Sequence, residues 1–198
     1  YGYVEGERPL TLPTGVSKKG HKFLGWYDNA EYNGDPVTQI PEGATTDFTF
    51  YGKWEPLKYT ITFDTDGSTE IDSITQDYGT PITKPADPEK EGYIFNGWSP
   101  KIPDTMPAEN MTIRARWTPI KYKLTIDTDG GTEIYPNPQE IDCGAYPFSY
   151  ITDPIKEGHY FIGWDPDIRT MPAHDVSVKA KWGKYNYKVT FWSDGDWL

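Results

Sequence analysis

The side chains of this sequence with the greatest capacity for acid–base chemistry or metal binding are three histidines. His21 and His159 occupy one position of a recurring G-x-x-F-x-G-W pattern, and a third copy of the pattern has Tyr93 there. Because tyrosine replaces histidine within one chain, we expect an aromatic packing role at this position and no catalytic or metal-binding role. His174 corresponds to Glu109 in another copy of the repeat, which predicts a turn or surface position.

The single cysteine and the serines add no further chemistry. Cys143 corresponds to Tyr78 of another copy, so we expect an aromatic-type or half-buried position for it. One cysteine can form neither an intramolecular disulfide nor a multi-thiolate metal site. No Ser/His/Asp or Cys/His set recurs, and no serine lies in a nucleophile-elbow sequence. The sequence therefore predicts a protein that is not an enzyme and that carries no metal or cofactor.

Two Asp-x-Asp-Gly stretches, residues 64–67 and 127–130, resemble the beginning of a calcium-binding loop. A complete EF-hand loop needs glycine at its sixth position and glutamate at its twelfth. Here glycine comes at the fourth position, and the twelfth is Thr75 or Pro138. Asp-Gly is also a favoured signal for a hairpin turn. A turn is the interpretation that we adopt, and calcium binding is the alternative.

The tryptophans offer flat rings on which a sugar could stack, but most of them recur where alternating strands end, which is typical of core positions. Trp192 and Trp197 break the pattern, since Trp192 replaces a repeated aspartate and Trp197 lies at the end of the sequence. If any aromatics contact a ligand, these two together with Tyr27 and Tyr32 are the best candidates. The two tryptophans could equally be uncovered because their repeat stops short.

The composition excludes several classes of partner. A net charge of -11 over 198 residues disfavours nucleic acid, which needs a basic surface, and an anionic membrane surface for the same reason. No stretch approaches the roughly 18 apolar residues of a membrane span, so we expect no membrane insertion of this segment. Aromatic residues make up 16% of the chain, which argues against disorder.

Three elements recur in one order and predict tandem modules. They are a strand-like segment ending in Asp-Gly, the G-x-x-F-x-G-W pattern, and a closing segment ending in tryptophan. The first module lacks the opening element, the next two are complete, and the last residues open a truncated fourth. The predicted boundaries are 1–56, 57–119, 120–183 and 184–198.

Alternation of apolar and polar residues predicts β-strands for the opening and closing elements. A small residue stands two positions before each closing tryptophan, which predicts that a neighbouring chain or ring approaches closely at Gly52, Ala115 and Ala180. Proline-rich connections between the strands predict turns or sheet edges. A short helix in each module would fit best at residues 70–78 and 133–142. We expect two tryptophans to close an aromatic core in each module, because a domain of about 60 residues buries little surface otherwise.

The ordered motifs carry a family resemblance. An opening Y-x-V-x-F-D-x-D/N-G-G strand, a central P-x-x-P-x-x-x-G-Y-x-F-x-G-W and a closing A-x-W appear at 59–67, 85–98 and 115–117, and again at 122–131, 154–164 and 180–182. With these motifs the chain resembles the Listeria–Bacteroides repeat family, which is related to the B repeats of internalin B. The resemblance implies an α+β, strand-dominated, β-grasp-like module used in tandem, with no conserved catalytic or ligand site.

The leading hypothesis is a non-catalytic repeat segment of a secreted bacterial protein on the cell surface or in the cell wall. The modules would form an extended array that acts as a spacer or stalk and contacts neighbouring modules. They would serve adhesion or host contact through a protein or glycan partner. The alternative is a set of carbohydrate-binding modules that accompanies an adhesin or a glycan-active enzyme.

Overall fold

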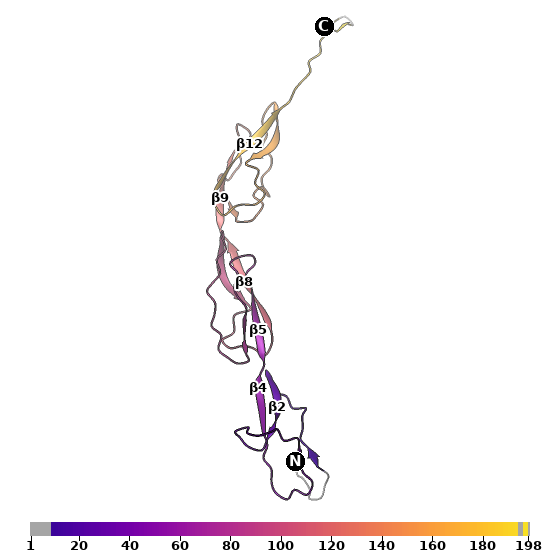
Figure 1. Cartoon of the computed structure of the whole chain (residues 1–198). Helices are drawn as coiled ribbons and strands as arrows, with labels where there is room; N and C mark the ends of the chain where they lie inside the picture. The colour runs from indigo at the N-terminus through magenta and orange to yellow at the C-terminus, as the bar shows by residue number, and fades with distance from the viewer. Residues whose placement is uncertain (1–8, 194–195, 198) are drawn as a thin grey trace. The chain divides into compact units, whose positions relative to one another are not determined.

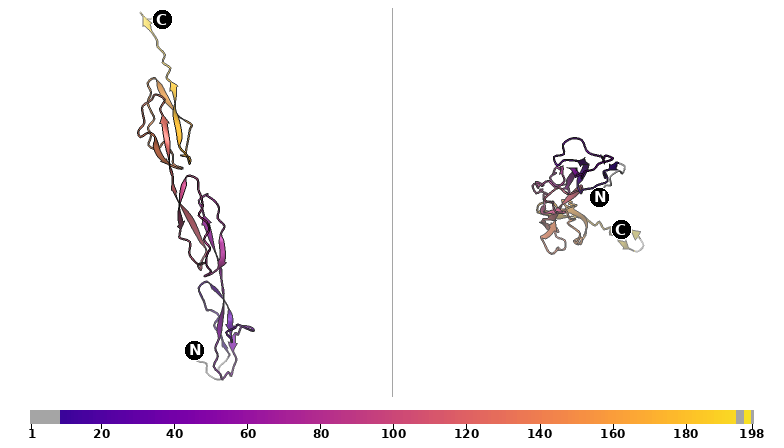
Figure 2. Two further views of the ribbon diagram at one scale, coloured as in Figure 1. Left: turned by 90° about the vertical axis from the view of Figure 1, so that its left-hand side faces the viewer. Right: turned by 90° about the horizontal axis from the view of Figure 1, so that it is seen from below.

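The structure is a computed structural model that describes the backbone of residues 9–193 and 196–197, and the side chains of residues 9–191. It contains strands, turns and irregular segments, and no helix among the described residues (Figure 1). Two further views show the same strands and connections (Figure 2).

The predicted α+β, β-grasp-like class is therefore wrong, because the described chain is all-β. The chain divides into two compact units, residues 1–88 with 97–115 and residues 89–96 with 116–198.

The first module contains two small antiparallel pairs. Strand β1 pairs with β3, and strand β2 pairs with β4. The bounds are β1 (Leu10–Thr11), β2 (His21–Tyr27), β3 (Gln39–Ile40) and β4 (Tyr51–Pro56).

The second and third modules each form a four-stranded sheet of the same topology. The strand orders are β6-β5-β8-β7 and β10-β9-β12-β11, and the two central strands of each sheet, β5 with β8 and β9 with β12, run parallel. Strands β13 (Trp192–Ser193) and β14 (Asp196–Trp197) follow as an antiparallel pair. The bounds are β5 (Lys58–Asp64), β6 (Ile74–Asp77), β7 (Tyr93–Ser99), β8 (Met111–Pro119), β9 (Lys121–Asp127), β10 (Gln139–Asp142), β11 (His159–Asp165) and β12 (Val176–Lys184).

Strands occupy the two segments where helices were expected. Residues 74–77 form β6 against β5, and residues 139–142 form β10 against β9. The segment 133–142 contains Pro136 and Pro138, each of which removes a backbone donor and disrupts a helix interior. The segment 70–78 is rich in β-branched residues, which favour a strand that can pair with its neighbour.

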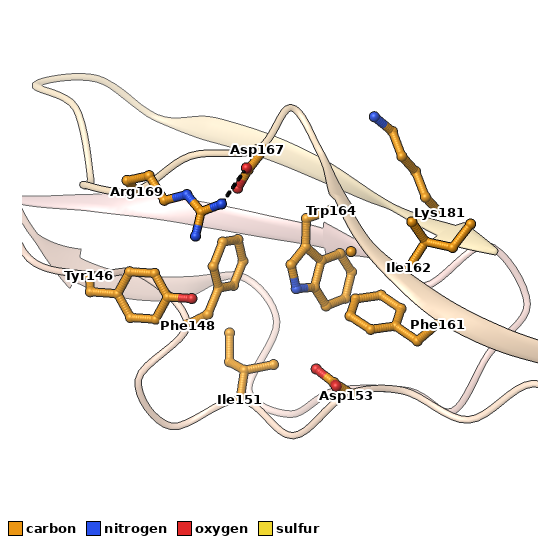
Figure 3. Close-up of a pocket in the computed structure, with 11 residues that line it drawn as sticks. Tyr146, Phe148, Ile151, Asp153, Phe161, Ile162, Trp164, Asp167, Arg169 and Lys181 are labelled. Atoms are coloured by element: carbon orange, nitrogen blue, oxygen red, sulfur yellow. Dashed lines mark hydrogen bonds and ion pairs between the residues drawn. The ribbon is translucent and has the colours of Figure 1, made fainter. Parts of the chain in front are cut away.

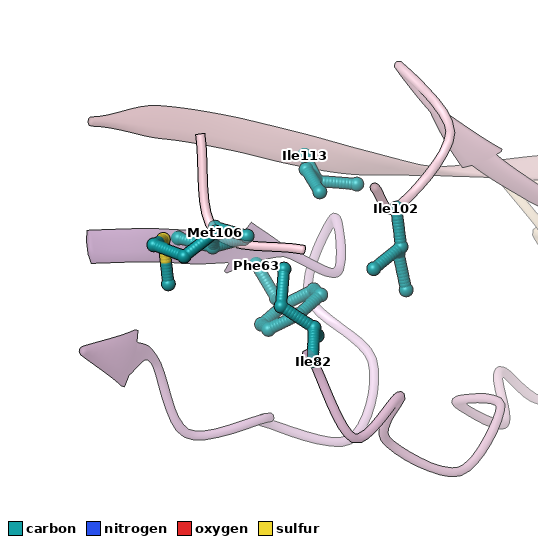
Figure 4. Close-up of a cluster of buried hydrophobic side chains, with 6 residues drawn as sticks. Phe63, Ile82, Ile102, Met106 and Ile113 are labelled. Carbon is teal, nitrogen blue, oxygen red and sulfur yellow. The ribbon is translucent and has the colours of Figure 1, made fainter. Parts of the chain in front are cut away.

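The sheet face that a helix would cover is covered by irregular segments instead. In the second module, β5 and β8 contribute Phe63 and Ile113, and the connecting segments contribute Ile82, Ile102 and Met106 (Figure 4). The third module repeats this arrangement with Leu124, Ile126, Val178 and Met171 among its buried residues. The methionine of each Met-Pro-Ala sequence is 1% exposed, so this motif anchors a loop in the core.

The tryptophans lie at the margin of these cores more than at their centres. The side chains that are completely buried are aliphatic residues, methionine and proline. Among the repeated tryptophans Trp164 is buried, and the others are half-buried. The tryptophans therefore cover the margins of the cores, whereas the centres consist mainly of aliphatic side chains and methionine.

A β-bulge explains the F-x-G-W motif. Strand β11 contains one extra residue, Ile162, between Phe161 and Gly163, and Gly163 has a φ of 147°. In a regular strand, residues three apart point to opposite faces. The extra residue returns Trp164 to the face of Phe161, and the two ring centroids lie 5.0 Å apart. The small residue of the closing strand, Ala180, lies directly opposite Trp164.

The same arrangement in the first module confirms the predicted close approach. Trp26 lies opposite Gly52, and a Cβ on Gly52 would lie 3.2 Å from the Trp26 ring and 3.3 Å from Phe23. The sequence pattern therefore encodes a ring packed over a small residue on the neighbouring strand.

Candidate functional site

The aromatic pair predicted for ligand contact in the first module has unequal exposure. Tyr27 is 7% exposed and Tyr32 is 39% exposed, and their rings meet edge to face at 5.6 Å. The Lys53 ammonium lies 5.1 Å from the Tyr27 centroid and 5.8 Å from the Tyr32 centroid. The Lys53 ammonium therefore already lies against both rings. The ligand-contact role of both tyrosines stays a prediction.

The other two predicted contact residues are placed only by their backbone. Trp192 and Trp197 lie opposite each other in the pairing of β13 with β14. Their side chains lie outside the described residues, so their contact role also stays a prediction.

The histidines make short local contacts. His21 packs edge to face on Tyr78 with the centroids 5.5 Å apart, which fits the packing role expected for this position. Its Nδ1 lies 2.8 Å from the Lys19 carbonyl oxygen, and Nδ1 of His159 lies 2.8 Å from that of Glu157. Residues 9–191 contain no group of three or more His, Cys, Asp or Glu side chains that could hold a metal ion.

The Asp-x-Asp-Gly stretches form turns, as the sequence predicts. Asp66 and Gly67 have φ values of 53° and 76°, and the Ser68 amide donates to the Thr65 carbonyl at 3.3 Å. Positive φ at both central residues is the pattern of the type I′ turn. In each turn the first aspartate accepts a hydrogen bond from the backbone amide of the second, at 3.1 Å for Asp64.

Lysines pair with the aspartates of the corresponding turn of the third module. Lys179 Nζ lies 2.7 Å from Asp129 Oδ1 and 3.6 Å from Asp127 Oδ2, and Lys156 Nζ lies 3.4 Å from Asp129 Oδ2. The hydrogen bond from Lys179 holds the pKa of Asp129 below its usual value, and the same bond raises the pKa of Lys179. In the second module Arg114 takes the equivalent place, 3.3 Å from Asp64.

Sequence reasoning did not predict the contacts at the joints between modules. One residue separates β4 from β5, and one separates β8 from β9; they are Leu57 and Ile120. The Leu57 amide donates to the Gly20 carbonyl at 2.8 Å, and the Leu57 carbonyl accepts from the Tyr78 amide at 2.8 Å. The connecting residue is therefore bonded to the module before it and to the module after it.

The second joint repeats this arrangement within the second compact unit. Ile120 donates to Gly92 at 2.8 Å and accepts from the Cys143 amide at 2.9 Å. The Tyr93 hydroxyl donates to the Cys143 carbonyl at 3.2 Å. A Cβ on Gly92 would overlap Cys143 Sγ and lie 3.0 Å from Ala173 Cβ, so the two modules are in direct contact here.

The contacts across the joints could have been found in the sequence from residues that vary in pairs. His21 faces Tyr78 at the first joint, and Tyr93 faces Cys143 at the second. The larger Tyr93 therefore faces the small Cys143, whereas the smaller His21 faces the large Tyr78. This pairing was the available signal, but it is visible only when two neighbouring repeats are compared together.

A groove of about 440 Å³ lies on the third module (Figure 3). Phe148 stacks on Trp164 at 5.6 Å, and Tyr146 meets the edge of Phe148 at 5.8 Å. Arg169 pairs with Asp167 at 2.8 Å along the rim. Asp153 also lines the groove, and neither its carboxylate nor the Tyr146 hydroxyl has a hydrogen-bond partner among the described residues. The groove thus offers aromatic faces beside open polar groups.

Substitution of Gly92 tests the second joint, with Gly158 as the matched control. Both glycines have positive φ, 78° and 70°, so alanine at either position adds backbone strain of about 1–2 kcal/mol. Only Gly92 is packed against a neighbouring module, and nothing lies within 4 Å of a Cβ on Gly158. We expect Gly92→Ala to lower the free energy of unfolding by about 1–3 kcal/mol more than Gly158→Ala in urea denaturation.

The double variant Gly92→Ala/Cys143→Ala should recover part of that difference, because it removes the overlapping sulfur. Equal losses from Gly92→Ala and Gly158→Ala would show that the joint contact contributes nothing.

Acid should weaken the third module through Asp129. Because its pKa is lowered in the folded state, its ion pairs stabilise the fold fully above about pH 4, and this stabilisation is lost as the pH falls through the folded-state value. Urea denaturation at pH 6 and pH 3 should show a smaller loss for Asp129→Asn than for the native chain. Asp153→Asn is the control, and it should keep the native loss. An identical loss in all three proteins would contradict this role of Asp129.

Comparison with known proteins places these features in a family. The Listeria–Bacteroides repeat domain matches three times, at residues 3–53, 59–116 and 122–181. Two relatives from Evansella cellulosilytica, provisionally named as a membrane protein and a Gly-rich membrane protein, are each 31% identical over 90% of this chain. Internalin H of Listeria monocytogenes is 33% identical over 54% of it.

The chain spans 29%, 22% and 21% of the lengths of these three relatives. The described part of the chain holds no helix with the length and hydrophobicity that a membrane crossing requires. The three repeat matches cover most of the sequence, in the order of the modules described above. The chain therefore belongs to the Listeria–Bacteroides repeat family.

Proposed function

We propose that this segment is a non-catalytic spacer in a bacterial cell-surface protein, where it holds another part of that protein at a set distance. The observation that carries the proposal is the joint, in which a single residue connects two modules and both of its backbone groups are bonded. A flexible linker would leave these groups to water. A segment joined in this way resists bending at the joint, which is what a spacer requires.

The names of the relatives support this location. They include two membrane proteins and an internalin, and the match to each covers less than a third of that relative. Repeats of this family therefore occur as parts of longer proteins. An acidic repeat with its own core is suited to extend such a protein away from the cell.

Distance measurement across the first joint tests the spacer role. Spin labels on two exposed residues, Lys22 in the first module and Thr112 in the second, report the distance by pulsed electron resonance in a Cys143→Ala background. We expect one narrow distribution, as narrow as that of a pair within the second module, Lys58 with Asp64, which are exposed at the two ends of β5 and about 20 Å apart. Insertion of four Gly/Ser residues after Leu57 should broaden it. A native distribution as broad as that of the insertion variant would contradict the proposal.

Glycan binding by the third module is the second candidate function, and the groove in Figure 3 favours it. Residues 146–151 are Tyr-Pro-Phe-Ser-Tyr-Ile, whereas residues 81–86 of the second module are Pro-Ile-Thr-Lys-Pro-Ala. The second module forms the same sheet without these aromatics, so the fold does not require them. Tyr146, which lines the groove, is 50% exposed, and exposed aromatic faces beside open polar groups suit the apolar face and hydroxyls of a sugar ring.

A glycan array tests this second function. The native chain should bind at least one class of surface glycan, and Tyr146→Ala should lose that binding because it removes both the ring edge and the open hydroxyl. Tyr160→Ala is a control, since Tyr160 is exposed outside the groove. No binding by the native chain, or equal binding by both variants, would contradict glycan recognition in the groove.

A further inference from the structure

The chain enters and leaves each complete module through two strands that lie side by side. In the second module the first strand is β5 and the last is β8, and the two are paired in parallel (Figure 1). In the third module β9 and β12 are paired in the same way. We propose that this pair makes each module a mechanical clamp that resists tension applied along the chain. This goes beyond a spacer role, because a spacer need not bear load.

The register of the pair sets how tension acts on it. Ile61 lies opposite Met111, and Asp64 lies opposite Arg114, so the paired stretch is four residues long in each strand. The chain enters at Lys58, before this stretch, and leaves at Pro119, beyond it. Tension on the two ends therefore pulls the strands past each other along their length. The hydrogen bonds between parallel strands are evenly spaced, so they share this load and must break together.

Side chains fasten the pair at both ends of the stretch. Next to the entry end, the Thr60 amide donates to Asn110 Oδ1 at 2.8 Å. At the far end, Arg114 pairs with Asp64 at 3.3 Å. These contacts join the same two strand ends that tension would slide apart.

The third module makes the equivalent contacts with different residues. The Lys123 amide donates to Asp175 Oδ1 at 2.8 Å, and Lys179 pairs with Asp127 and Asp129. Asparagine and aspartate thus accept the backbone hydrogen bond at the entry end of the pair, and arginine and lysine form the ion pair at its far end. Two modules that differ in these residue types keep the same two fastenings.

The core shields the paired stretch from water on one face. Ile61 and Ile113 are completely buried in the second module, as are Leu124 and Val178 in the third. Backbone hydrogen bonds beside such residues face little competition from water, which strengthens them. The joints deliver tension directly to this stretch, since only one residue lies between β8 and β9.

In the second module, the pair of β5 with β6 has a geometry that should not resist tension in this way. Lys58 at the start of β5 lies opposite Asp77 at the end of β6, in an antiparallel pair. Tension applied to these two positions opens the hydrogen bonds one after another from the end. Because only one bond carries the load at a time, this geometry should yield at much lower force.

Optical tweezers on the 198-residue chain test the clamp. Handles on the two chain termini should give two high-force events, each lengthening the chain by roughly 200 Å, since a complete module has about 60 residues at 3.3–3.6 Å each. Handles attached through Lys58→Cys and Asp77→Cys, in a Cys143→Ala background, should open β5 from β6 at a force severalfold lower. Equal forces in the two geometries would overturn the proposal.

Asn110→Ala tests the fastening and keeps the third module as an internal reference. One of the two high-force events should move to lower force, while the other and the opening force between positions 58 and 77 stay unchanged. Glu109→Ala, at the neighbouring exposed residue, should leave both events in place. If Asn110→Ala leaves both high-force events unchanged, or lowers the force in both pulling geometries alike, the fastening does not bear load.

Discussion

The parallel pairing of the first and last strands is the constraint on which the rest of each complete module depends. Two parallel neighbours cannot be joined by a tight turn, so the chain must cross from the end of one to the start of the other. Here the crossing includes an antiparallel strand on each side of the pair. In the second module the pairing also makes the chain leave at the end opposite to its entry, where the third module begins after one residue.

This crossing explains the features of the module that distinguish it from a helix-covered sheet. The connecting segments are proline-rich, and they cover the sheet with a few anchors, Ile82, Ile102 and Met106 in the second module. The F-x-G-W bulge places both its rings on one face, where they pack at the margin of the core. A small module thus closes its core with loops and a bulged edge strand, and it has no helix in the described residues.

The sequence pattern within one repeat predicted the structural features that depend on local backbone geometry. The alternating strands, the Asp-Gly turns and the small residue beneath Trp26 all follow from spacing within a single repeat. The helices expected at 70–78 and 133–142 were wrong, because pairing with β5 and β9 decides these short segments. The joint at Gly92 could not be predicted from one repeat, since its partner Cys143 lies in the next. The groove depends on how loop 146–151 folds against Trp164, which no periodicity describes.

Amide hydrogen exchange at the joints tests most directly the claim that each module is fixed to the next by its backbone. The amides of Ile120 and Cys143 each donate one hydrogen bond across the second joint. The account predicts that both exchange as slowly as the amide of Ile126, which is bonded within the third module. Exchange of Ile120 and Cys143 at the rate of an unstructured chain, with Ile126 still protected, would show that the modules fold separately and that the joint is a flexible hinge.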